Sequence, residues 1–599
     1  MASDTMQKFE QDLLDRLAER PQATPDTRGA GNIIYVGDHA NCDVPDLDSA
    51  LASAQDNDEL RLQNQTFEGR FQIHGKSISV IGGFEDCTGA EPRFSSTLQG
   101  EFTTTLEITH PESQSTVSDV RLENLNITNG IGTSDLLGGG VHIEGGLLDV
   151  VLIDVVIRDN ETAARGGGLM ATGNTGPMVT IRGDSVIQNN IAVEGGGLAC
   201  VGPQDTPGVN QPLLVIDTGL VWLNEARRGG GVYSNNCTVI SHAGGLLQGI
   251  VNNEASSGSG ADTGQGGGIF AEQHSGIGLF GAPGFFGEGD PDSPALLADN
   301  NAASIGGGAL IRGDSSMTAS DAVIESNSAG NNGGGIHVTE SSFTMERVNG
   351  TTCREDRCSR LRGNSAQTGG GISIVNPNDG TTRGASGTAS SVVITQTFVS
   401  GNRAIGSGSN DDDGAGAAVF ILDGSAYLEG NVMFENSGDN LIRQQPNTSL
   451  TLAWSTAADN ASNGGALLLA RGAASGDTRT RLLSSIVQNP DGDIMALDAS
   501  SGTGFDFVAD CLVANELTSM PGVSGSIAES DPGFLDPAAD DYHLRHDAPA
   551  VDLCSDSNVS VEPDMDDQDR GFAVTDPAAP FDAGADESQG VIFANGFET

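Results

Sequence analysis

Apolar residues in this chain occur in short runs separated by glycine, asparagine and aspartate. One representative stretch has three such runs, at 169–171, 178–181 and 185–188. Short apolar runs bounded by turn-forming residues predict β-strands. Within the repeating part of the chain, no segment has apolar side chains at the helical spacing i, i+3, i+4, i+7. The pattern therefore predicts three short strands in each repeat.

A glycine triplet followed by an aliphatic residue marks each repeat. The first glycines of these triplets are Gly138, Gly166, Gly195, Gly229, Gly266, Gly306, Gly333 and Gly369. An asparagine precedes many of the triplets, as at Asn160, Asn189, Asn224, Asn300, Asn327 and Asn364. The shortest gaps between triplets are 27 to 29 residues, and degenerate copies follow at 414–416 and 463–465. A period of this size predicts a solenoid. With three strands per coil the solenoid is a parallel β-helix, whose strands hydrogen-bond from coil to coil at about 4.8 Å.

The triplet has a structural explanation. Glycine adopts positive φ without steric cost, and it allows two backbones to approach closely. Asparagines at the same place in successive coils can stack as an amide ladder. A phosphate-binding loop would instead need a strand–loop–helix context and usually a lysine, and no lysine follows Lys76.

The N-terminal part of the chain differs from the repeats. In residues 1–31, Met6, Phe9, Leu13 and Leu17 share one face of a predicted short helix, which a linker follows. Residues 32–130 read as strand 34–37, helix 48–54 and strands 59–62, 66–69 and 77–83. This order resembles the opening of pectin-lyase-like proteins, in which a helix covers the first coil. The resemblance implies an all-β fold, a right-handed parallel β-helix.

Two further resemblances concern the repeats and the C-terminal region. The Gly-Gly-aliphatic and Asn elements of residues 131–515 are similar to polymorphic outer membrane protein repeats. Residues 516–590 resemble the choice-of-anchor Q domain of bacterial surface proteins. The resemblance rests on 531–536, Tyr542-His543-Leu544, 548–552, Asp564, Asp566 and 569–571. One departure is Cys554, which stands near the place of a usual glycine. The tail 591–599 resembles the Phe-x-x-Gly-Phe-Glu ending of secreted proteins from some gammaproteobacteria. These resemblances imply attachment to a cell envelope.

Composition narrows the possible partners. The 81 acidic and 28 basic residues give a net charge of −53, which excludes nucleic acid and anionic membranes as partners. The sequence has no apolar run of 18 residues, so we expect no membrane insertion. No signal peptide is visible, so export would use a leader that has been removed or another route. We expect the protein to be a monomer. The eight cysteines suggest local pairs and an oxidising compartment. By proximity the pairs are Cys42 with Cys87, Cys200 with Cys237, Cys353 with Cys358, and Cys511 with Cys554.

Insertions and acidic clusters provide the candidate binding residues. Phe280, Phe285 and Phe286 form either a contact patch for a glycan or protein, or a cover over apolar coil surface. Asp411, Asp412 and Asp413 suit calcium as oxygen ligands, with a solvated turn as the alternative. The carboxylates Asp552, Asp564 and Asp582 either bind a metal or hold turns and Arg570. Apart from this calcium, no cofactor is predicted.

The β-helix fold also occurs in polysaccharide lyases and glycoside hydrolases, so an enzyme is the competing hypothesis. The hydrolase series Asn-Thr-Asp, Asp-Asp, Gly-His-Gly and Arg-Ile-Lys is absent from the sequence, and His337 stands alone on a predicted strand. We therefore expect a secreted or cell-surface binding, adhesive or structural module whose partner is a glycan or a surface protein. The alternative is a lyase or hydrolase with a divergent site. It would need a groove with convergent carboxylates and a basic residue.

Overall fold

The computed structural model describes most of residues 31–588. Its internal gaps are 89–90, 112–115, 133–137, 174–175, 204–210, 243–247, 259–261, 282–292, 348–358, 376–388, 407–411, 464, 475–477, 491, 517, 519, 521–526, 530, 556–562, 567 and 572–579. The predicted N-terminal helix and the tail 591–599 lie outside the described residues. The chain divides into two units, one of residues 1–304 and 308–318 and one of residues 305–307 and 319–599.

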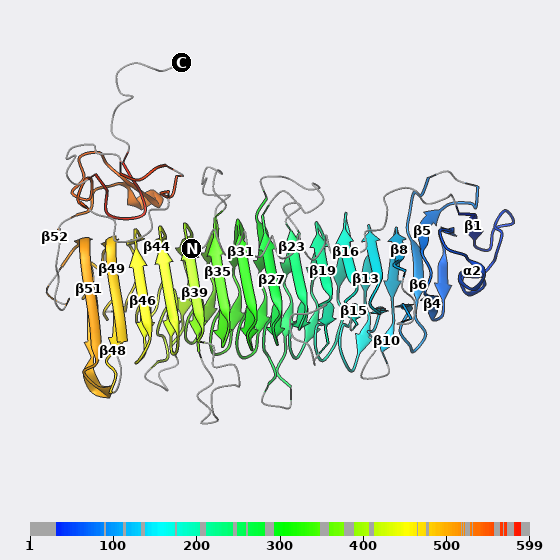
Figure 1. The fold of residues 1–599 in the computed structure, drawn as a ribbon, viewed down its shortest axis with the longest axis horizontal. Coiled ribbons are helices and arrows are strands. Elements are labelled where there is room, and N and C mark those ends of the chain that lie inside the picture. The colour runs from blue at the N-terminus through cyan, green and yellow to red at the C-terminus, as the bar shows by residue number, and fades with distance from the viewer. Residues whose placement is uncertain are drawn as a thin grey trace, which may run out of the picture. The chain divides into compact units, whose positions relative to one another are not determined.

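Each unit is a stack of coils with three main strands per coil (Figure 1). In the first unit one coil consists of β15 (Leu169–Thr172), β16 (Met178–Arg182) and β17 (Val186–Gln188). Each of these strands pairs in parallel with the equivalent strand of the next coil. The predicted all-β fold, a parallel β-helix with three short strands per coil, is confirmed.

The strands of the first unit form three parallel rows, opened by β1 (Ile33–Val36) beside β2. The first row is β2 (Glu59–Gln63), β5 (Ile78–Phe84), β8 (Ser118–Glu123), β12 (Leu148–Ile153), β16, β19 (Leu213–Asp217), β23 (Thr238–His242) and β27 (Gly276–Phe280). The second row is β3 (Thr66–Glu68), β6 (Ser96–Gln99), β9 (Leu125–Thr128), β13 (Val156–Arg158), β17, β20 (Leu220–Trp222), β24 (Gly249–Val251) and β28 (Ala295–Ala298). The third row is β4 (Phe71–His74), β7 (Leu106–Thr109), β11 (Val141–Glu144), β15, β18 (Leu198–Val201), β22 (Val232–Asn235), β26 (Ile269–Glu272) and β30 (Ala309–Arg312).

The second unit repeats this plan. Its first row is β35 (Ser342–Glu346), β39 (Ser391–Thr395), β43 (Ser425–Glu429), β46 (Ser449–Ala453), β49 (Thr478–Val487), β51 (Phe505–Ala514) and β52 (Ile527–Glu529). Its second row is β32 (Ala322–Glu325), β36 (Arg360–Arg362), β40 (Phe398–Ser400), β44 (Val432–Phe434) and β47 (Thr456–Ala457). Its third row is β34 (Ile336–Thr339), β38 (Ile372–Ile374), β42 (Val419–Ile421), β45 (Ile442–Gln444), β48 (Leu468–Arg471) and β50 (Met495–Asp498).

Inward-facing aliphatic side chains stack into the core. Leu169, Leu198 and Val232 occupy the same position in three successive coils, and each is fully buried. The glycine triplet precedes this position. Gly166 has φ +67°, and a Cβ there would lie 2.4 Å from the carbonyl oxygen of Leu169. The triplet therefore bends the chain tightly over the strand that it starts, as the sequence predicted.

A ladder of buried asparagines stabilises one corner in each unit. In the first unit it consists of Asn160, Asn190, Asn224, Asn253 and Asn300, and in the second of Asn327, Asn364, Asn402, Asn436 and Asn460. Each rung donates its amide to the side-chain oxygen of the next, at 2.9–3.0 Å. The sequence-based choice of Asn189 is wrong by one position. Asn189 has φ +53° and is exposed, while Asn190 carries the rung.

The degenerate repeat at 414–416 is also displaced from its predicted register. The residues that hydrogen-bond to Gly370, Gly371 and Ile372 of the preceding coil are Gly416, Ala417 and Ala418, in that order. Gly416 has φ +67°, the value of a first triplet glycine, so the corresponding segment is 416–418.

One helix and three described disulfides complete the coils. Helix α2 (Leu47–Ser53) is capped by Asp46, buries Leu47 and Leu51, and contacts β1 and β4 of the first unit. The disulfides are Cys42–Cys87, Cys200–Cys237 and Cys511–Cys554, which are three of the pairs predicted from proximity. Cys353 and Cys358 lie outside the described residues.

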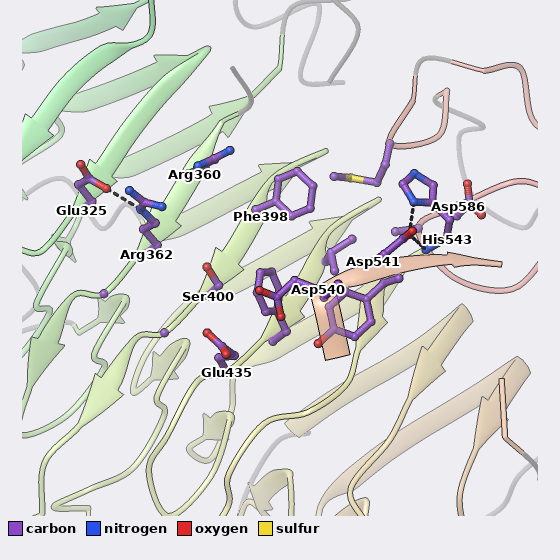
Figure 2. Close-up of a pocket in the computed structure, with 18 of the residues that line it drawn as sticks. Glu325, Arg360, Arg362, Phe398, Ser400, Glu435, Asp540, Asp541, His543 and Asp586 are labelled. Carbon is purple, nitrogen blue, oxygen red and sulfur yellow. Dashed lines mark hydrogen bonds and ion pairs between the residues drawn. The ribbon is translucent and has the colours of Figure 1, made fainter. Parts of the chain in front are cut away.

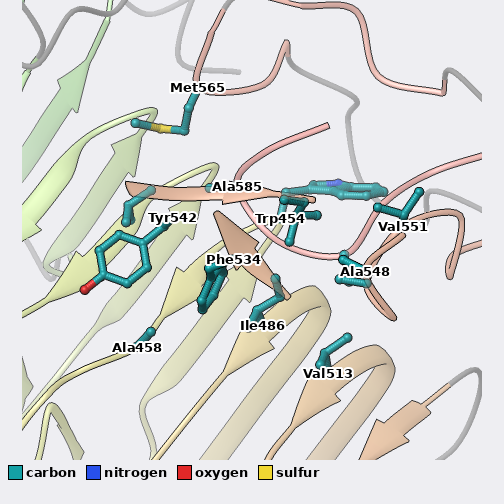
Figure 3. Packing of buried hydrophobic residues seen from close by; sticks show 14 of the residues in the cluster. Trp454, Ala458, Ile486, Val513, Phe534, Tyr542, Ala548, Val551, Met565 and Ala585 are labelled. Carbon is teal, nitrogen blue, oxygen red and sulfur yellow. The ribbon is translucent and has the colours of Figure 1, made fainter. Parts of the chain in front are cut away.

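A C-terminal cap, formed by the described residues of 531–588, packs against the outside of the coils in the second unit (Figure 3). It contains the antiparallel pair β53 (Phe534–Asp536) and β54 (Asp541–Leu544), joined by the 3-10 turn η2 (Pro537–Ala539). Its apolar side chains surround the fully buried Trp454, and Cys511–Cys554 ties it to β51. The cap also receives hydrogen bonds from the coils, such as the 2.7 Å bond from Arg347 Nη1 to the Met565 carbonyl.

Candidate functional site

A groove of about 680 Å³ lies between the second row of strands in the second unit and the cap (Figure 2). This volume is within the range of small-ligand pockets. Strands β32, β36, β40 and β44 supply its floor, because alternate side chains of these strands point away from the core. β54, the turn at 565–566 and residues 585–586 supply its wall.

Two columns of outward-facing residues, one from each coil, form the floor. The first column contains Arg360, Phe398 and Val432, and the second contains Glu325, Arg362, Ser400 and Phe434. Glu325 accepts a 2.5 Å hydrogen bond from Arg362 Nε. The Glu325–Arg362 pair lies at one end of the groove, away from His543 (Figure 2).

The corner before the asparagine ladder shapes the bottom of the groove. Ser326, Gly363, Gly401 and Glu435 occupy equivalent places in successive coils, with φ values between +54° and +62°. Each immediately precedes a ladder asparagine. Two of the four are glycines, so the floor lacks side chains in the middle, and Glu435 extends from the fourth coil.

Aromatic rings form one side of the groove. Phe398 and Phe434 are edge to face with ring centroids 6.5 Å apart, and Tyr542 of the cap lies 5.3 Å from Phe434. The Tyr542 hydroxyl donates to Asp459 at 3.0 Å, and burial raises the pKa of this tyrosine far above its usual value. Tyr542 is therefore neutral and fixed in place.

Both faces of strand β54 border the groove, with the Tyr542 ring on one face and the Asp541 and His543 side chains on the other. Tyr542 and Leu544 are buried in the cap, so Asp541 and His543 lie on the opposite face. His543 Nδ1 lies 2.5 Å from Asp541 Oδ1, and His543 Nε2 lies 2.9 Å from Asp566 Oδ2. The hydrogen bond to Asp566, together with that to Asp541, raises the pKa of His543 to about 10.

Asp586 completes this end of the groove. It is 8% exposed, and its Oδ2 accepts a 2.7 Å hydrogen bond from the Leu544 N–H of β54. Burial raises the pKa of the Asp586 carboxyl to about 6. Of the described residues, His543, Asp566 and Asp586 are the group whose potential ligand atoms all lie within 4.8 Å of one another.

A second acidic cluster lies behind the groove, inside the cap. Both carboxylate oxygens of Asp582 accept backbone N–H groups, from Asp552 at 2.7 Å and Ser588 at 2.6 Å. Burial, and then the charge of Glu587, raises the pKa of Asp582 to about 8. Arg570 stacks 4.8 Å from the Trp454 ring centroid and donates to the Ala585 carbonyl at 2.8 Å.

Asp564 also accepts backbone N–H groups, from Gln568 and Glu587, and its pKa is raised by burial. The described contacts of Asp564 and Asp582 match the alternative that these carboxylates hold turns, and Asp552 lies beside them through its backbone. Calcium at these residues stays a prediction.

The other predicted site residues lie elsewhere. Phe280 is buried against Leu213, Val215 and Ile240 of the first unit, consistent with a role in covering the coil, and Phe285 and Phe286 lie outside the described residues. Asp412 Oδ1 accepts hydrogen bonds from Arg443 at 3.1 Å and from Gln445 at 2.7 Å. Asp413 is buried, and Asp411 lies outside the described residues.

Sequence reasoning assigned no role to the residues that line the groove. His543 and Asp566 were visible only as parts of the C-terminal motif. The alternation Asp541-Tyr542-His543-Leu544 was the available signal, since it places the two polar side chains on one face. Nothing in the sequence indicated which coils the cap would cover.

No protein-family model and no curated protein matches this chain. Among the described residues, no helix has the length and apolar character needed to cross a membrane.

Proposed function

We propose that this protein is a secreted or cell-surface glycan-binding β-helix, and that it binds an oligosaccharide in the groove beneath the cap. The observation that carries the proposal is the combination of aromatic rings and hydrogen-bonding side chains in one groove. Phe398 and Phe434 offer apolar surface to the faces of sugar rings. Ser400, Glu435 and the Glu325–Arg362 pair offer partners for hydroxyl groups.

The charge of the groove indicates the class of glycan. Six carboxylates line it, against three basic side chains, Arg360, Arg362 and His543. Arg362 is paired with Glu325, and His543 with Asp541 and Asp566. An acidic groove on a chain of net charge −53 repels polyuronates. The proposed ligand is therefore a neutral oligosaccharide or one that carries amino groups.

The cellular setting is part of the same proposal. Three disulfides suit an oxidising compartment, and the strongly acidic chain suits a soluble surface outside the cell. The finer resemblances, to polymorphic outer membrane protein repeats and to the choice-of-anchor Q domain, support placement at a bacterial surface. In this proposal the cap both belongs to the surface-attachment region and forms one wall of the groove.

Glycan binding is tested by isothermal titration with neutral, amino and uronic oligosaccharides of equal length. We expect saturable binding of a neutral or amino sugar, and about tenfold weaker binding in Phe398→Ala because a stacking surface is lost. Phe505→Ala is the matched control, since Phe505 is a partly buried strand residue of the same unit that does not line the groove. Preferential binding of polygalacturonate, or equal effects of the two variants, would reject the proposal.

One observation favours a hydrolase as the second candidate. Asp586, with its pKa raised to about 6 by burial, has the property required of a general acid, and other carboxylates share the groove. A lyase is less well supported because its usual polyuronate substrate would meet this acidic surface. The test is whether the protein releases new reducing ends from an oligosaccharide that it binds. If it does, and Asp586→Asn abolishes this release, the protein is a hydrolase and not only a binding protein.

A further inference from the structure

The end of the groove near the cap brings together a histidine and three carboxylates from separate segments. β54 supplies Asp541 and His543, the turn at 565–566 supplies Asp566, and Asp586 follows the buried Ala585. Figure 2 shows Asp541, His543 and Asp586 converging at one end. Imidazole nitrogen and carboxylate oxygen together are a typical ligand set for divalent transition metals.

We propose that His543, Asp566 and Asp586 bind a divalent transition-metal ion, with zinc bound more tightly than manganese or calcium, and that Asp541 orients the histidine from behind. The proposal rests on the arrangement of these four side chains. It does not depend on glycan binding.

The separations fit a single ion. Zinc–nitrogen and zinc–oxygen bonds are about 2.0–2.2 Å, so ligand atoms around one ion lie about 3–4.5 Å apart. The potential ligand atoms of His543, Asp566 and Asp586 already lie within 4.8 Å of one another. Small side-chain rotations therefore suffice to place an ion among them, since Asp566 and His543 are partly exposed and border open space.

Asp541 gives the histidine the orientation that a metal site needs. A metal-bound imidazole commonly donates its second ring N–H to a carboxylate, which fixes the tautomer and the ring plane. Without a metal, both ring N–H groups of His543 donate, Nδ1–H to Asp541 Oδ1 at 2.5 Å and Nε2–H to Asp566 Oδ2 at 2.9 Å. A bound ion would take the place of the Nε2 proton and leave the bond to Asp541 intact. Asp541 and His543 share one face of β54, so the strand itself sets this pairing.

Buried contacts and hydrogen bonds hold the residues that carry the proposed ligands. Tyr542 and Leu544 anchor β54 in the buried cluster, and the Leu544 N–H holds Asp586 at 2.7 Å. The Asp566 N–H donates to Asp564 Oδ1 at 2.9 Å. Ligands fixed in this way lose little conformational entropy on binding. Three protein ligands would leave coordination positions for solvent or another ligand.

The ligand types favour zinc over calcium. Calcium takes six to eight oxygen ligands, and a histidine nitrogen is a poor substitute. For a mixed nitrogen and oxygen site, zinc binds more tightly than manganese in the general order of stabilities. The competing interpretation is that a protonated His543 merely joins Asp541 and Asp566 as an ion pair. In that case no metal displaces the proton.

Zinc titration of the full chain, after removal of metals with a chelator, tests the proposal. We expect one zinc ion per chain at pH 7, with release of a proton as the histidine changes from ion pair to ligand. His543→Gln and Asp566→Asn should each weaken this site at least a hundredfold, and Asp541→Asn about 10–100-fold. Asp547→Asn is the matched control, because Asp547 is exposed and on the same segment but outside the cluster.

Cobalt substitution provides a second, spectroscopic measurement of the same site. Cobalt bound through an imidazole gives a visible absorption spectrum that should disappear in His543→Gln and persist in Asp547→Asn. Far-ultraviolet circular dichroism verifies that the variants fold. Zinc binding that is equally strong in His543→Gln and wild type, or calcium binding tighter than zinc, would overturn the proposal. All titrations use the metal alone, so failure of glycan binding leaves the result unaffected.

Discussion

Replacing Asn402 by alanine removes one rung from the asparagine ladder of the second unit. The Asn402 side chain is fully buried and makes four hydrogen bonds. Its oxygen accepts from Asn364 N at 3.1 Å and from Asn364 Nδ2 at 3.0 Å. Its amide donates to the Leu361 carbonyl at 2.8 Å and to Asn436 Oδ1 at 3.0 Å. Asn402→Ala therefore leaves polar groups of three neighbouring residues without these partners in a buried corner.

The expected loss of stability follows from these contacts. A buried hydrogen bond contributes roughly 0.5–1.5 kcal/mol net, so four bonds amount to about 2–6 kcal/mol. Because the former partners stay buried without hydrogen bonds, we expect Asn402→Ala to lower the free energy of unfolding by about 4 kcal/mol, the middle of this range. Coils of a solenoid are stabilised mainly by their neighbours, so the effect should be greatest in the adjacent coils.

Amide hydrogen exchange with mass spectrometry measures this local effect. Peptides that cover residues 360–375 and 389–404 should exchange roughly a thousandfold faster in Asn402→Ala, which corresponds to about 4 kcal/mol. Asn331→Ala is the control, because Asn331 is an exposed asparagine of the same unit. If Asn402→Ala changes exchange no more than Asn331→Ala does, the ladder is not a major source of stability and the reasoning is wrong.

Two further predictions concern the cap. Cys511 and Cys554 are separated by 43 residues, so their disulfide closes a long loop. The double variant Cys511→Ser/Cys554→Ser should therefore lower the free energy of unfolding of the docked cap by about 4 kcal/mol, measured by urea unfolding. An unchanged urea midpoint would contradict a docking role for this disulfide. The pKa of Asp582 is raised from 3.8 to about 8, so its contribution is fully present below pH 4 and is lost as the pH rises to about 8. In a Trp222→Phe background, where buried Trp454 reports on the cap, the urea midpoint should be lower at pH 8 than at pH 5, and a rise would refute this.

The regular part of the fold could be predicted because each coil repeats the same local requirements. The three strands of the coil at 169–188, the glycine turns and helix α2 all follow from spacing and residue type. The errors arose where two neighbouring residues fit the same pattern. Asn189 and Asn190 are both asparagines, and only the left-handed conformation of the first decides which one enters the ladder.

The groove could not be predicted because its parts come from distant segments. Outward-facing residues of each coil are not constrained by the core, so Phe398 and Arg362 differ from their neighbours without a visible pattern. Which of these residues become part of a site depends on where the cap docks. Contacts such as Arg347 to Met565, 218 residues apart, fix that position and leave no local signal in the sequence.

The position of the groove has a physical logic within the second unit. A stack of similar coils presents similar corners along one face, and a repeated corner alone does not distinguish one ligand position from the next. The cap makes one position along the face different, because it covers only some of the coils. It also places four polar side chains beside the aromatic rings of the floor: Asp541, His543, Asp566 and Asp586. Function is therefore expected where the repetition is broken. A consequence follows for variants along the face: Arg362→Ala, on the groove floor, should alter ligand binding, whereas Arg403→Ala, on the short neighbouring strand β41 (Arg403–Ala404) and outside the groove lining, should not.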